Sequence, residues 1–488
     1  MYIVKIPKCM STQHPDNVNT PFFAENTEIG GEDEILEAYY AFSHLGCDEQ
    51  MWDCEGKEVD NFVVKKLLTK YESFFREKKL GREVFITLRV PNPTIEKSEA
   101  KILLETLESI PRSFDAAKLF YAENITPIFE IILPMTTSSK CLDRIYRYYC
   151  DFVVGKQNKP FNAGDITIAK WIGKFRPKKI NVSPLFEDME HMLNAHNITR
   201  EYLQEKNVEY QRVFLARSDP AMNYGFISAV FLNKIALQRL QKMSDNIGIK
   251  IYPIIGMGSA PFRGNLKPQT VERVMKEYPS VHTFTIQSAF KYDNPSDQVE
   301  ESIRKLKERK SGLPQEIDEK RCLEIIRKYS QEYQKQIIEL APLVNKIAKY
   351  IPSRRKRKLH IGLFGYSRKL GKITLPRVIT FTSALYSIGL PPEILGLNAL
   401  NKDDIQFIKE VYINFEDDLR DAFKYLNTDM IFLPKNLKTK IKKFPIDFER
   451  DEKYKKITDY IVCALKENKT EDLEEYILRA ASLRKFLG

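Results

Sequence analysis

RVFLARS, residues 212–218, is a short apolar run that ends in polar residues and is followed by a longer helical stretch. Runs of the same kind recur at residues 50–54 (QMWDC), 84–90 (VFITLRV), 127–134 (PIFEIILP), 180–186 (INVSPLF), 251–257 (IYPIIGM), 282–288 (HTFTIQS) and 359–365 (LHIGLFG). β-Rich runs separated by helical segments indicate parallel strands covered on both faces, and eight of them suffice for a closed barrel. We therefore predict an α/β fold, a (β/α)8 TIM barrel. An open doubly wound sheet is the alternative, but no GxGxxG motif follows an early strand.

The rest of the chain adds helices to this barrel. Residues 315–350 carry apolar side chains at helical spacing, and after residue 385 the pattern is helical to the end. The chain has no internal repeat and no Gly/Ser-rich linker. We therefore expect a single catalytic barrel domain over residues 1–488, with residues 386–488 as a helical C-terminal extension packed on the barrel.

Composition excludes several classes of protein. The 488 residues are 43% hydrophobic, which is enough for a large core, but no apolar run approaches the length that crosses a bilayer. The seven Cys include no CxxC pair and no signal peptide precedes them, so a disulfide framework or zinc ribbon is not expected. We expect a soluble, cytoplasmic protein that does not bind a membrane.

The net charge of +11 raises the question of nucleic-acid binding. The sharpest basic cluster is RRKRK, residues 354–358, which could contact phosphates or act as a localisation patch. Elsewhere Lys and Arg alternate with Asp and Glu, as in residues 299–310, which is typical of solvated helix faces. A basic chain also suits an enzyme whose substrates are anions, and we expect no nucleic-acid partner.

The segment STQHPDNVNTP, residues 11–21, is the most unusual polar stretch. It combines His14, Pro15, Asp16, amides and hydroxyls with almost no apolar content, so it is not predicted as a core strand or helix. It is typical of an ordered loop that carries chemistry. The alternative is a solvated N-terminal arm.

Polar residues also gather where the predicted strands end. In a TIM barrel these carboxyl ends face one shared site. Glu187 and Asp219 could hold a divalent cation, because Mg²⁺ takes one or two protein carboxylates and leaves its other positions to water and substrate. Arginines at the same mouth would clamp phosphate or carboxylate groups, and GMGSAPFRGNL (256–266) could cradle an anion with backbone N–H groups. The candidate substrate-binding residues are Arg89, Arg217, Ser259, Lys291 and Arg368.

Nine motifs together carry a resemblance to a known family. In chain order they are STQHPDNVNTP, WDCEGKEVD, FITLRVPNP, PLFEDMEHM, LARSDPAMNYG, GMGSAPFRG, FTIQSAFKYD, FGYSR and LYSIGLPPE, between about residues 7 and 395. The set resembles the archaeal-type phosphoenolpyruvate carboxylases. The resemblance implies a lyase, usually a homotetramer, that uses Mg²⁺ or Mn²⁺ to convert phosphoenolpyruvate and bicarbonate to oxaloacetate and phosphate, through carboxyphosphate and a metal-bound pyruvate enolate.

The longer bacterial and plant members of the family let roles be carried onto this sequence. The likeness of TQHPD to their T-A-H-P-T-E loop implies that His14 is catalytic. PLFED and RSDP imply that Glu187 and Asp219 are the metal ligands. The matching Arg positions imply that Arg263 is catalytic and that Arg89 and Arg368 bind substrate. Lys291 lies near the position where the family has an Arg that binds the substrate phosphate.

Two departures from the family pattern concern charge. Met257 replaces the first Arg of the Gly-rich loop, and Met222 replaces the Lys that follows Y-S-D-S-A, so the site must obtain those charges elsewhere or do without them. Two other classes remain open at this point. One is another Mg²⁺-dependent barrel acting on phosphoenolpyruvate or a related keto acid, such as a mutase, lyase or kinase. The other is an RNA or DNA binder that uses residues 354–358.

Overall fold

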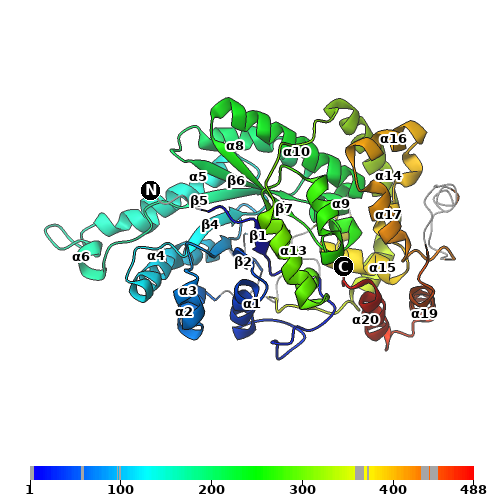
Figure 1. Ribbon diagram of the computed structural model, residues 1–488, viewed down its shortest axis with the longest axis horizontal. Coiled ribbons are helices and arrows are strands. Elements are labelled where there is room, and N and C mark those ends of the chain that lie inside the picture. Colours follow the sequence, from blue (N-terminus) through cyan, green and yellow to red (C-terminus); the bar gives the residue numbers. More distant parts are fainter. Residues whose placement is uncertain are drawn as a thin grey trace.

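A closed barrel of parallel strands forms the centre of the molecule (Figure 1). The computed structural model describes residues 5–488 apart from 57–59, 96, 98–99, 358–367, 371–372, 430–438 and 440–448, and for residues 368–370 it gives the backbone alone. The barrel strands are β1 (Cys9–Ser11), β2 (Glu49–Asp53), β3 (Phe85–Arg89), β4 (Ile128–Leu133), β5 (Asn181–Phe186), β6 (Tyr210–Ala216), β7 (Lys250–Gly256) and β8 (Thr283–Ile286). The predicted (β/α)8 TIM barrel is confirmed.

One strand of the barrel differs from the prediction. The first strand is β1, which the sequence did not reveal because its three residues, CMS, are too few to form an apolar run. β1 pairs with β2 on one side and with β8 on the other, so it closes the barrel. The predicted strand at residues 359–365 lies outside the described residues, and the barrel closes without it. The prediction of 359–365 as the eighth barrel strand was therefore wrong.

Side chains from alternate strand positions fill the barrel interior in layers. The middle of the interior is apolar and contains the cluster of Met10, Met51, Ile132, Leu185, Phe214, Ala216 and Ile254. Two positions earlier along the strands, buried Arg212 donates to Glu49 (Nη2 to Oε2, 2.7 Å). Glu187 comes two positions after Leu185, directly after β5. Arg89 is the last residue of β3 and comes two positions after Thr87, whose hydroxyl donates to Glu49 inside the barrel. The strand period of two therefore directs these two side chains to the barrel mouth.

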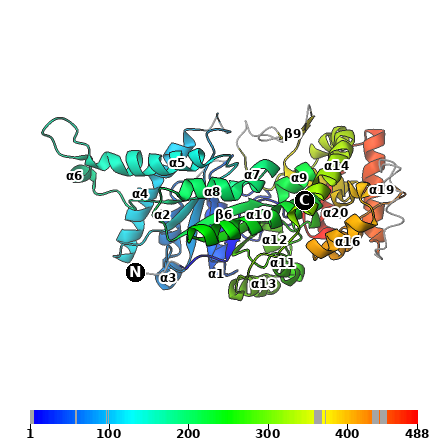
Figure 2. The same cartoon turned by 90° about the horizontal axis from the view of Figure 1, so that it is seen from above.

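Helices cover the outside of the barrel. They are α1 (Glu32–Ser43), α2 (Val63–Lys70), α3 (Glu72–Glu77), α4 (Ile102–Tyr121), α5 (Ser139–Arg147), α7 (Met189–Leu193), α8 (Ala195–Leu203), α9 (Ser218–Tyr224), α10 (Phe226–Ile247), α11 (Val271–Glu277), α12 (Ser288–Tyr292) and α13 (Ser296–Glu308). Short helical turns are η1 (Tyr148–Val154), η2 (Gly155–Asn158), η3 (Pro261–Arg263) and η4 (Pro268–Thr270). The segment around α6 (Ile168–Ile172) projects away from the barrel in both views (Figures 1 and 2).

The described C-terminal part of the chain is mainly helical. Beyond the barrel come α14 (Glu319–Ala348), the antiparallel pair β9 (Arg368–Leu370) and β10 (Ile373–Leu375), α15 (Val378–Ser387), η5 (Pro392–Ile394), η6 (Leu397–Ala399), α16 (Lys402–Val411), α17 (Phe415–Phe423), α19 (Glu452–Glu467) and α20 (Leu473–Arg484). These helices gather at the end of the molecule opposite to α6 (Figure 2). Buried Asn265, in the loop after β7, donates to Asp418 of α17 and joins this group of helices to the barrel.

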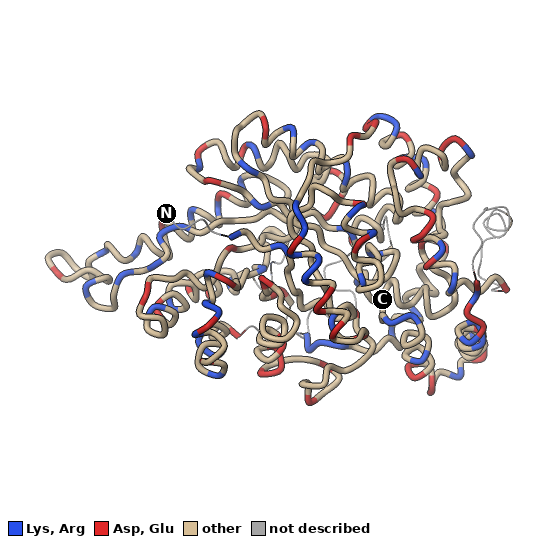
Figure 3. The backbone as a smooth tube through the Cα atoms, in the orientation of Figure 1, with Lys and Arg blue, Asp and Glu red and all other residues tan. Residues whose placement is uncertain are grey.

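Charge and hydropathy of the elements agree with this arrangement. Lys and Arg alternate with Asp and Glu along the outer helices (Figure 3), as solvated helix faces do. No single helix among the described residues is long and apolar enough to cross a membrane, although a pair bent by 92°, Val378–Ser387 with Pro392–Ala399, passes on length and composition.

Candidate active site

The polar segment 11–21 is bonded to the loops that follow β7 and β8. Asp16 accepts hydrogen bonds from the backbone N–H of Ala289 (2.7 Å), after β8, and from that of Ser259 (3.5 Å), after β7. The next turn of the segment is held by Asp293, whose carboxylate oxygens accept from the N–H groups of Val18 (2.7 Å) and Asn19 (2.8 Å). The prediction of an ordered loop is confirmed, except that its first residue, Ser11, is the last residue of β1.

This segment forms part of the wall of a cavity of about 530 Å³ at the barrel mouth. The apolar interior layer, including Met51 and Phe214, lines part of the cavity. Six residues predicted for the site also line it: His14, Arg89, Glu187, Arg217, Asp219 and Arg263. Residues that are far apart in the sequence are thus brought to one chamber by the carboxyl ends of different strands, as expected for this fold.

Glu187 and Asp219 are the two predicted metal ligands in the cavity wall. Glu187 directly follows β5, and one of its carboxylate oxygens accepts from the N–H of Met135 (2.6 Å). Asp219 lies in the first turn of α9, after β6. Among the described residues no group of three or more His, Cys, Asp and Glu is arranged as a metal site. Two carboxylates in a water-accessible cavity nevertheless fit Mg²⁺, which keeps several positions for water and substrate.

Arg89 is held in a bidentate ion pair. Its Nε and Nη2 donate to the two carboxylate oxygens of Asp53 (3.0 and 2.7 Å), and Nη2 also lies 3.1 Å from Glu55. Burial disfavours the charged guanidinium, but the neighbouring carboxylates raise the pKa of Arg89 above its usual value. The pairing fixes the plane of a permanent cation at the mouth of the barrel.

His14 presents a neutral imidazole to this chamber. Its Nδ1 lies 2.9 Å from the hydroxyl of Thr12. Burial lowers the pKa of His14 well below its usual value, and nearby positive charges, Arg89 first among them, lower it further. A neutral ring at neutral pH has one nitrogen that can accept a proton.

Arg263 is fully engaged in the loop between β7 and α11. Its Nη1 donates to Asp16 (3.2 Å) and to the carbonyl of Gly488 (2.6 Å), and its Nη2 donates to Gln287 (2.5 Å). A Cβ atom at Gly258 would stand 2.7 Å from the Arg263 guanidinium, so the Gly-rich loop can wrap around this side chain only without one. The loop therefore positions Arg263 at the point where the N-terminal segment meets the cavity.

Three predicted substrate-binding residues donate hydrogen bonds to carbonyl groups of the protein itself. The Arg217 guanidinium donates to the carbonyl of Phe262 (3.2 Å). Ser259 donates to the carbonyl of Leu266 (3.2 Å), and buried Lys291 donates to Glu37 and to the carbonyl of Thr12 (3.0 Å each). Ser259 and Lys291 are not among the described residues that line the cavity. The side chain of Arg368 lies outside the described part of the chain. Their assignment to substrate binding stays a prediction.

Three arginines of the basic run that begins at residue 354 face inward, which sequence reasoning missed, whereas Lys356 is exposed. Arg355 is buried and pairs with Glu34 and Glu37 (2.8 Å each). Arg354 is also buried and donates to the carbonyl of Val18 (2.8 Å). These anchors place Arg357 in the cavity wall, together with Arg377 from the residue before α15. A run of like charges does not reveal from sequence which of its members point inward.

Arg357 and Arg377 make this part of the wall strongly positive. Burial, together with the neighbouring charge of Arg377, lowers the pKa of Arg357 to about 9. A cation whose charged form is disfavoured by neighbouring cations is stabilised by a bound anion. The two arginines therefore form an anion-attracting face of the cavity.

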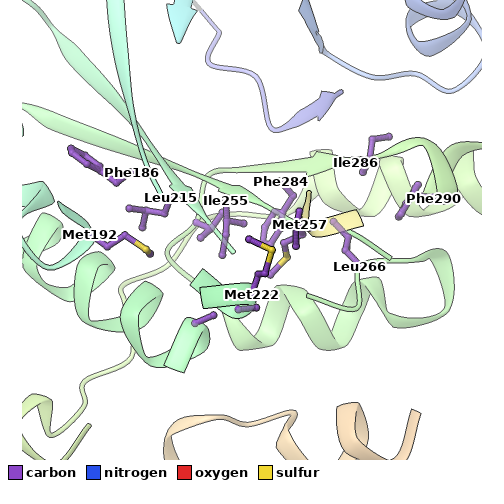
Figure 4. Packing of buried hydrophobic residues seen from close by; sticks show 14 of the residues in the cluster. Phe186, Met192, Leu215, Met222, Ile255, Met257, Leu266, Phe284, Ile286 and Phe290 are labelled. Atoms are coloured by element: carbon purple, nitrogen blue, oxygen red, sulfur yellow. The ribbon is translucent and has the colours of Figure 1, made fainter. Parts of the chain in front are cut away.

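The two methionines that replace charged residues of the family pattern lie in the hydrophobic core. Met222 and Met257 are both buried, and Figure 4 shows them close to Leu266 and Phe284. A cation at either position would be surrounded by apolar side chains. The arginines that line the cavity, Arg357 and Arg377 among them, come from other parts of the chain.

Comparison with known proteins agrees with this geometry. The profile of the family described as phosphoenolpyruvate carboxylase matches residues 6–488. The curated phosphoenolpyruvate carboxylase of Methanothermobacter thermautotrophicus is 60% identical over 485 residues, covering 99% of this chain and 100% of that protein. Those of Methanospirillum hungatei and Pyrococcus furiosus are 59% and 51% identical, with the same coverage of both chains. The resemblance noted in the sequence is confirmed, and the chain belongs to the phosphoenolpyruvate carboxylase family.

Proposed function

We propose that this protein is a phosphoenolpyruvate carboxylase, a carbon–carbon lyase that forms oxaloacetate and phosphate from phosphoenolpyruvate and bicarbonate. The observation that carries the proposal is that the imidazole of His14 lines the same cavity as the carboxylates of Glu187 and Asp219. Membership of the family supports the reaction class. The reaction gives the cell a four-carbon acid from a three-carbon one, which is an anaplerotic role.

Both substrates are anions, and the cavity wall is suited to them. Arg89, Arg263, Arg357 and Arg377 all line it. Arginine binds phosphate and carboxylate groups through parallel N–H···O bonds, each stronger than a bond between neutral groups. Holding the phosphoryl group of phosphoenolpyruvate beside bicarbonate requires this positive charge, because the two anions repel each other.

Glu187 and Asp219 would hold the divalent cation, Mg²⁺ or Mn²⁺. Oxygen donors suit both ions. When bound there, the cation supplies positive charge that stabilises the negative charge developing on substrate oxygens. The other contributions to the reaction come from side chains of this protein.

The arginines hold the reactants while a bicarbonate oxygen forms a bond to phosphorus and the bond from phosphorus to the enol oxygen breaks. The products of this step are carboxyphosphate and the enolate of pyruvate. His14 then takes the carboxyl proton of carboxyphosphate, and the bond between carbon and the bridging oxygen breaks to give CO₂ and phosphate. The enolate carbon attacks CO₂ to form oxaloacetate, and His14 gives its proton to phosphate.

Protonation of the enolate would give pyruvate, so the cavity must keep proton donors away from that carbon. The low pKa of His14 is suited to this requirement, because the ring is neutral until it takes the carboxyphosphate proton. We assign the closing of the cavity to the loop at residues 256–266. In this mechanism the neutral ring cannot protonate the enolate while it forms, and an enclosed chamber keeps water from it until CO₂ adds.

The remaining features of the proposal are expectations from the sequence, and the tetramer rests on family likeness. We expect a cytoplasmic homotetramer that acts on small molecules and binds neither nucleic acid nor a membrane, and in which residues 386–488 form a helical extension of one catalytic domain. Light scattering tests the assembly, because a tetramer has four times the mass of the 57.0 kDa chain. Buried Arg354 and Arg355 argue against the use of the basic run on nucleic acid.

The purified protein tests the proposed activity. It is incubated with phosphoenolpyruvate and Mg²⁺, with and without bicarbonate, and oxaloacetate is coupled to malate dehydrogenase and NADH. Oxaloacetate that forms only when bicarbonate is present supports the proposal. A mutase, a kinase or another lyase acting on phosphoenolpyruvate would form no oxaloacetate under either condition, and that result would refute it.

A further inference from the structure

The hydroxyl group of Thr12 lies between the imidazole of His14 and a backbone carbonyl. Its Oγ1 is 2.9 Å from His14 Nδ1 and 3.2 Å from the carbonyl oxygen of Ile286. Thr12 is the residue after β1, and Ile286 is the last residue of β8. The side chain of Thr12 is fully buried, so the hydroxyl proton must go to one of these two neighbours.

The backbone around Thr12 is fixed on two sides. Its N–H donates to the same Ile286 carbonyl (3.0 Å), which continues the pairing of β1 with β8. Its own carbonyl accepts from the buried ammonium of Lys291 (3.0 Å), which also donates to Ser11 (3.1 Å). Lys291 is itself paired with Glu37 (3.0 Å). The hydroxyl therefore occupies a fixed place relative to the barrel.

The single hydroxyl proton of Thr12 has one favourable direction. If it pointed at His14 Nδ1, the hydroxyl oxygen and the Ile286 carbonyl oxygen would face each other 3.2 Å apart without a proton between them, which is unfavourable in a buried place. If it points at Ile286, the carbonyl accepts from both the N–H and the O–H of Thr12 with its two lone pairs. The hydroxyl oxygen then has lone pairs free to accept the N–H of His14 Nδ1.

We propose that Thr12 is a positioning residue that holds neutral His14 in the tautomer with the proton on Nδ1, so that Nε2 is the nitrogen that accepts the carboxyphosphate proton. The inference rests on the proposed function, which makes His14 the base. It also gives Lys291 a role at a distance, as the clamp on the backbone of Thr12. In the opposite tautomer Nε2 would carry a hydrogen, and the ring could not accept a proton at that atom.

The hydroxyl has a second effect once the proton has been transferred. The imidazolium form donates from both nitrogens, and Thr12 Oγ1 is already placed to accept the Nδ1–H bond, which becomes charge-assisted. No reorganisation is needed at that moment. Thr12 should therefore affect the rate of the chemical step and have little effect on substrate binding.

The tautomer can be measured directly in the free, full-length protein. The chain has six His residues, so ¹⁵N-histidine labelling gives few signals, and the signals of His14 are those absent from His14→Asn. We expect the chemical shifts and couplings of a ring protonated at Nδ1 in the wild type and in Thr12→Ser, and a mixed or reversed tautomer in Thr12→Val. A wild-type ring protonated at Nε2 would overturn the inference, and would do so whatever the outcome of the activity assay.

Kinetics give the second readout. Thr12→Val should lower kcat for oxaloacetate formation roughly ten- to a hundredfold, while KM for phosphoenolpyruvate changes little. This loss is smaller than the roughly 10⁴-fold loss that a wrong His tautomer causes in a serine protease. Thr12→Ser, which keeps the hydroxyl, should stay within about threefold of the wild type. Thr382→Val is a matched control, because that buried hydroxyl also donates to a carbonyl, that of Val378 (2.7 Å), and is not hydrogen-bonded to any His of the described residues.

Two kinetic results would contradict the proposal. One is a Thr12→Val enzyme with wild-type kcat. The other is a Thr12→Ser enzyme as slow as Thr12→Val, which would mean that packing and not the hydroxyl is required. A wild-type protein that forms no oxaloacetate would refute the proposed function, and in that case the ¹⁵N spectrum alone decides the inference on Thr12.

Discussion

At the scale of single residues, burial and a set of fixed positive charges control the chemistry of the cavity. His14 is kept neutral because burial and the arginines around it lower its pKa. The same arginines raise the affinity for anions, so one feature serves both the base and the substrates. Positions 222 and 257, where the family pattern has a charge, hold methionines, and Arg357 and Arg377 line the cavity from a later part of the chain.

Asp219→Asn tests the proposed metal site. The variant keeps the shape of the side chain but removes a negative charge from a pair of carboxylates, so metal affinity should fall. We expect the Mg²⁺ concentration for half-maximal activity to rise by more than roughly tenfold. A tenfold loss of metal affinity already follows when a residue that only supports a metal ligand is removed. The measurement is a Mg²⁺ titration of oxaloacetate formation at saturating substrates. An unchanged midpoint would show that Asp219 is not a ligand.

Arg357→Gln tests the anion-attracting face of the cavity. A lost charge-assisted hydrogen bond costs about 1.5 to 3 kcal/mol, so KM for phosphoenolpyruvate should rise roughly ten- to a hundredfold. The matched control is Lys356→Gln, which removes the same charge from the next residue of the run. Lys356 is exposed and is not one of the cavity-lining residues. Equal effects of the two substitutions would mean that overall charge, and not a contact in the cavity, determines KM.

At the scale of elements, the site depends on how the N-terminal segment is fixed to the barrel. Glu37 of α1 pairs with Lys291 of α12 (3.0 Å) and with Arg355 of the basic run (2.8 Å), and all three side chains are buried. Through Lys291 and Arg355 this one carboxylate connects the backbone beside His14 to the segment that carries Arg357. The loop of the base and the arginine wall are therefore held by a common cluster.

Glu37→Gln should destabilise the fold and show how stability depends on pH. Burial alone would raise the pKa of Glu37, but Arg355 and Lys291 lower it to about 2. An acid whose pKa falls on folding adds stability that is complete above its ordinary pKa, near 4.5, and is lost as the pH falls toward 2. We expect the variant to lose about 3 kcal/mol of unfolding free energy at pH 7, because buried Lys291 loses its carboxylate and buried Arg355 keeps only Glu34.

Urea unfolding at pH 7 and at pH 3.5 measures this effect. The difference between wild type and Glu37→Gln should shrink at the lower pH, where the carboxylate of the unfolded chain is protonated. Glu72→Gln is the control, because Glu72 is 60% exposed in its pair with Arg76 and should contribute less than about 1 kcal/mol. A wild-type to Glu37→Gln difference independent of pH would show that the cluster acts by packing alone.

The arrangement of the elements also explains which features of the fold could be predicted from the sequence. Strands β2 to β8 were visible because strands covered on both faces are continuous apolar runs. β1 was not visible, because CMS is short and ends in Ser11, which is already part of the polar segment. The inward direction of Arg354 and Arg355 could not be predicted either. Arg355 is held by carboxylates of α1 and Arg354 by the carbonyl of Val18, all more than three hundred residues away in the chain.

At the scale of the whole molecule, the barrel explains why separate motifs act together. His14, Arg89, Glu187, Asp219 and Arg263 were each predicted for the site from motifs, and the closed barrel brings all of them to one cavity. Ser259 and Lys291 were also predicted, because they follow the strands that end at this mouth, but their side chains are used to hold loops. Position after a strand predicts the neighbourhood of a residue, whereas the direction of its side chain depends on partners from other elements.

The central claim is that His14 and the carboxylates of Glu187 and Asp219 act in one cavity. The product ratio of a His14→Asn variant tests this claim most directly. The variant is supplied with phosphoenolpyruvate, Mg²⁺ and bicarbonate, and oxaloacetate and pyruvate are measured separately by coupling to malate dehydrogenase and lactate dehydrogenase. We predict that it still binds phosphoenolpyruvate and Mg²⁺ but forms no oxaloacetate, and that any product is pyruvate with phosphate. Wild-type formation of oxaloacetate by this variant would contradict the account.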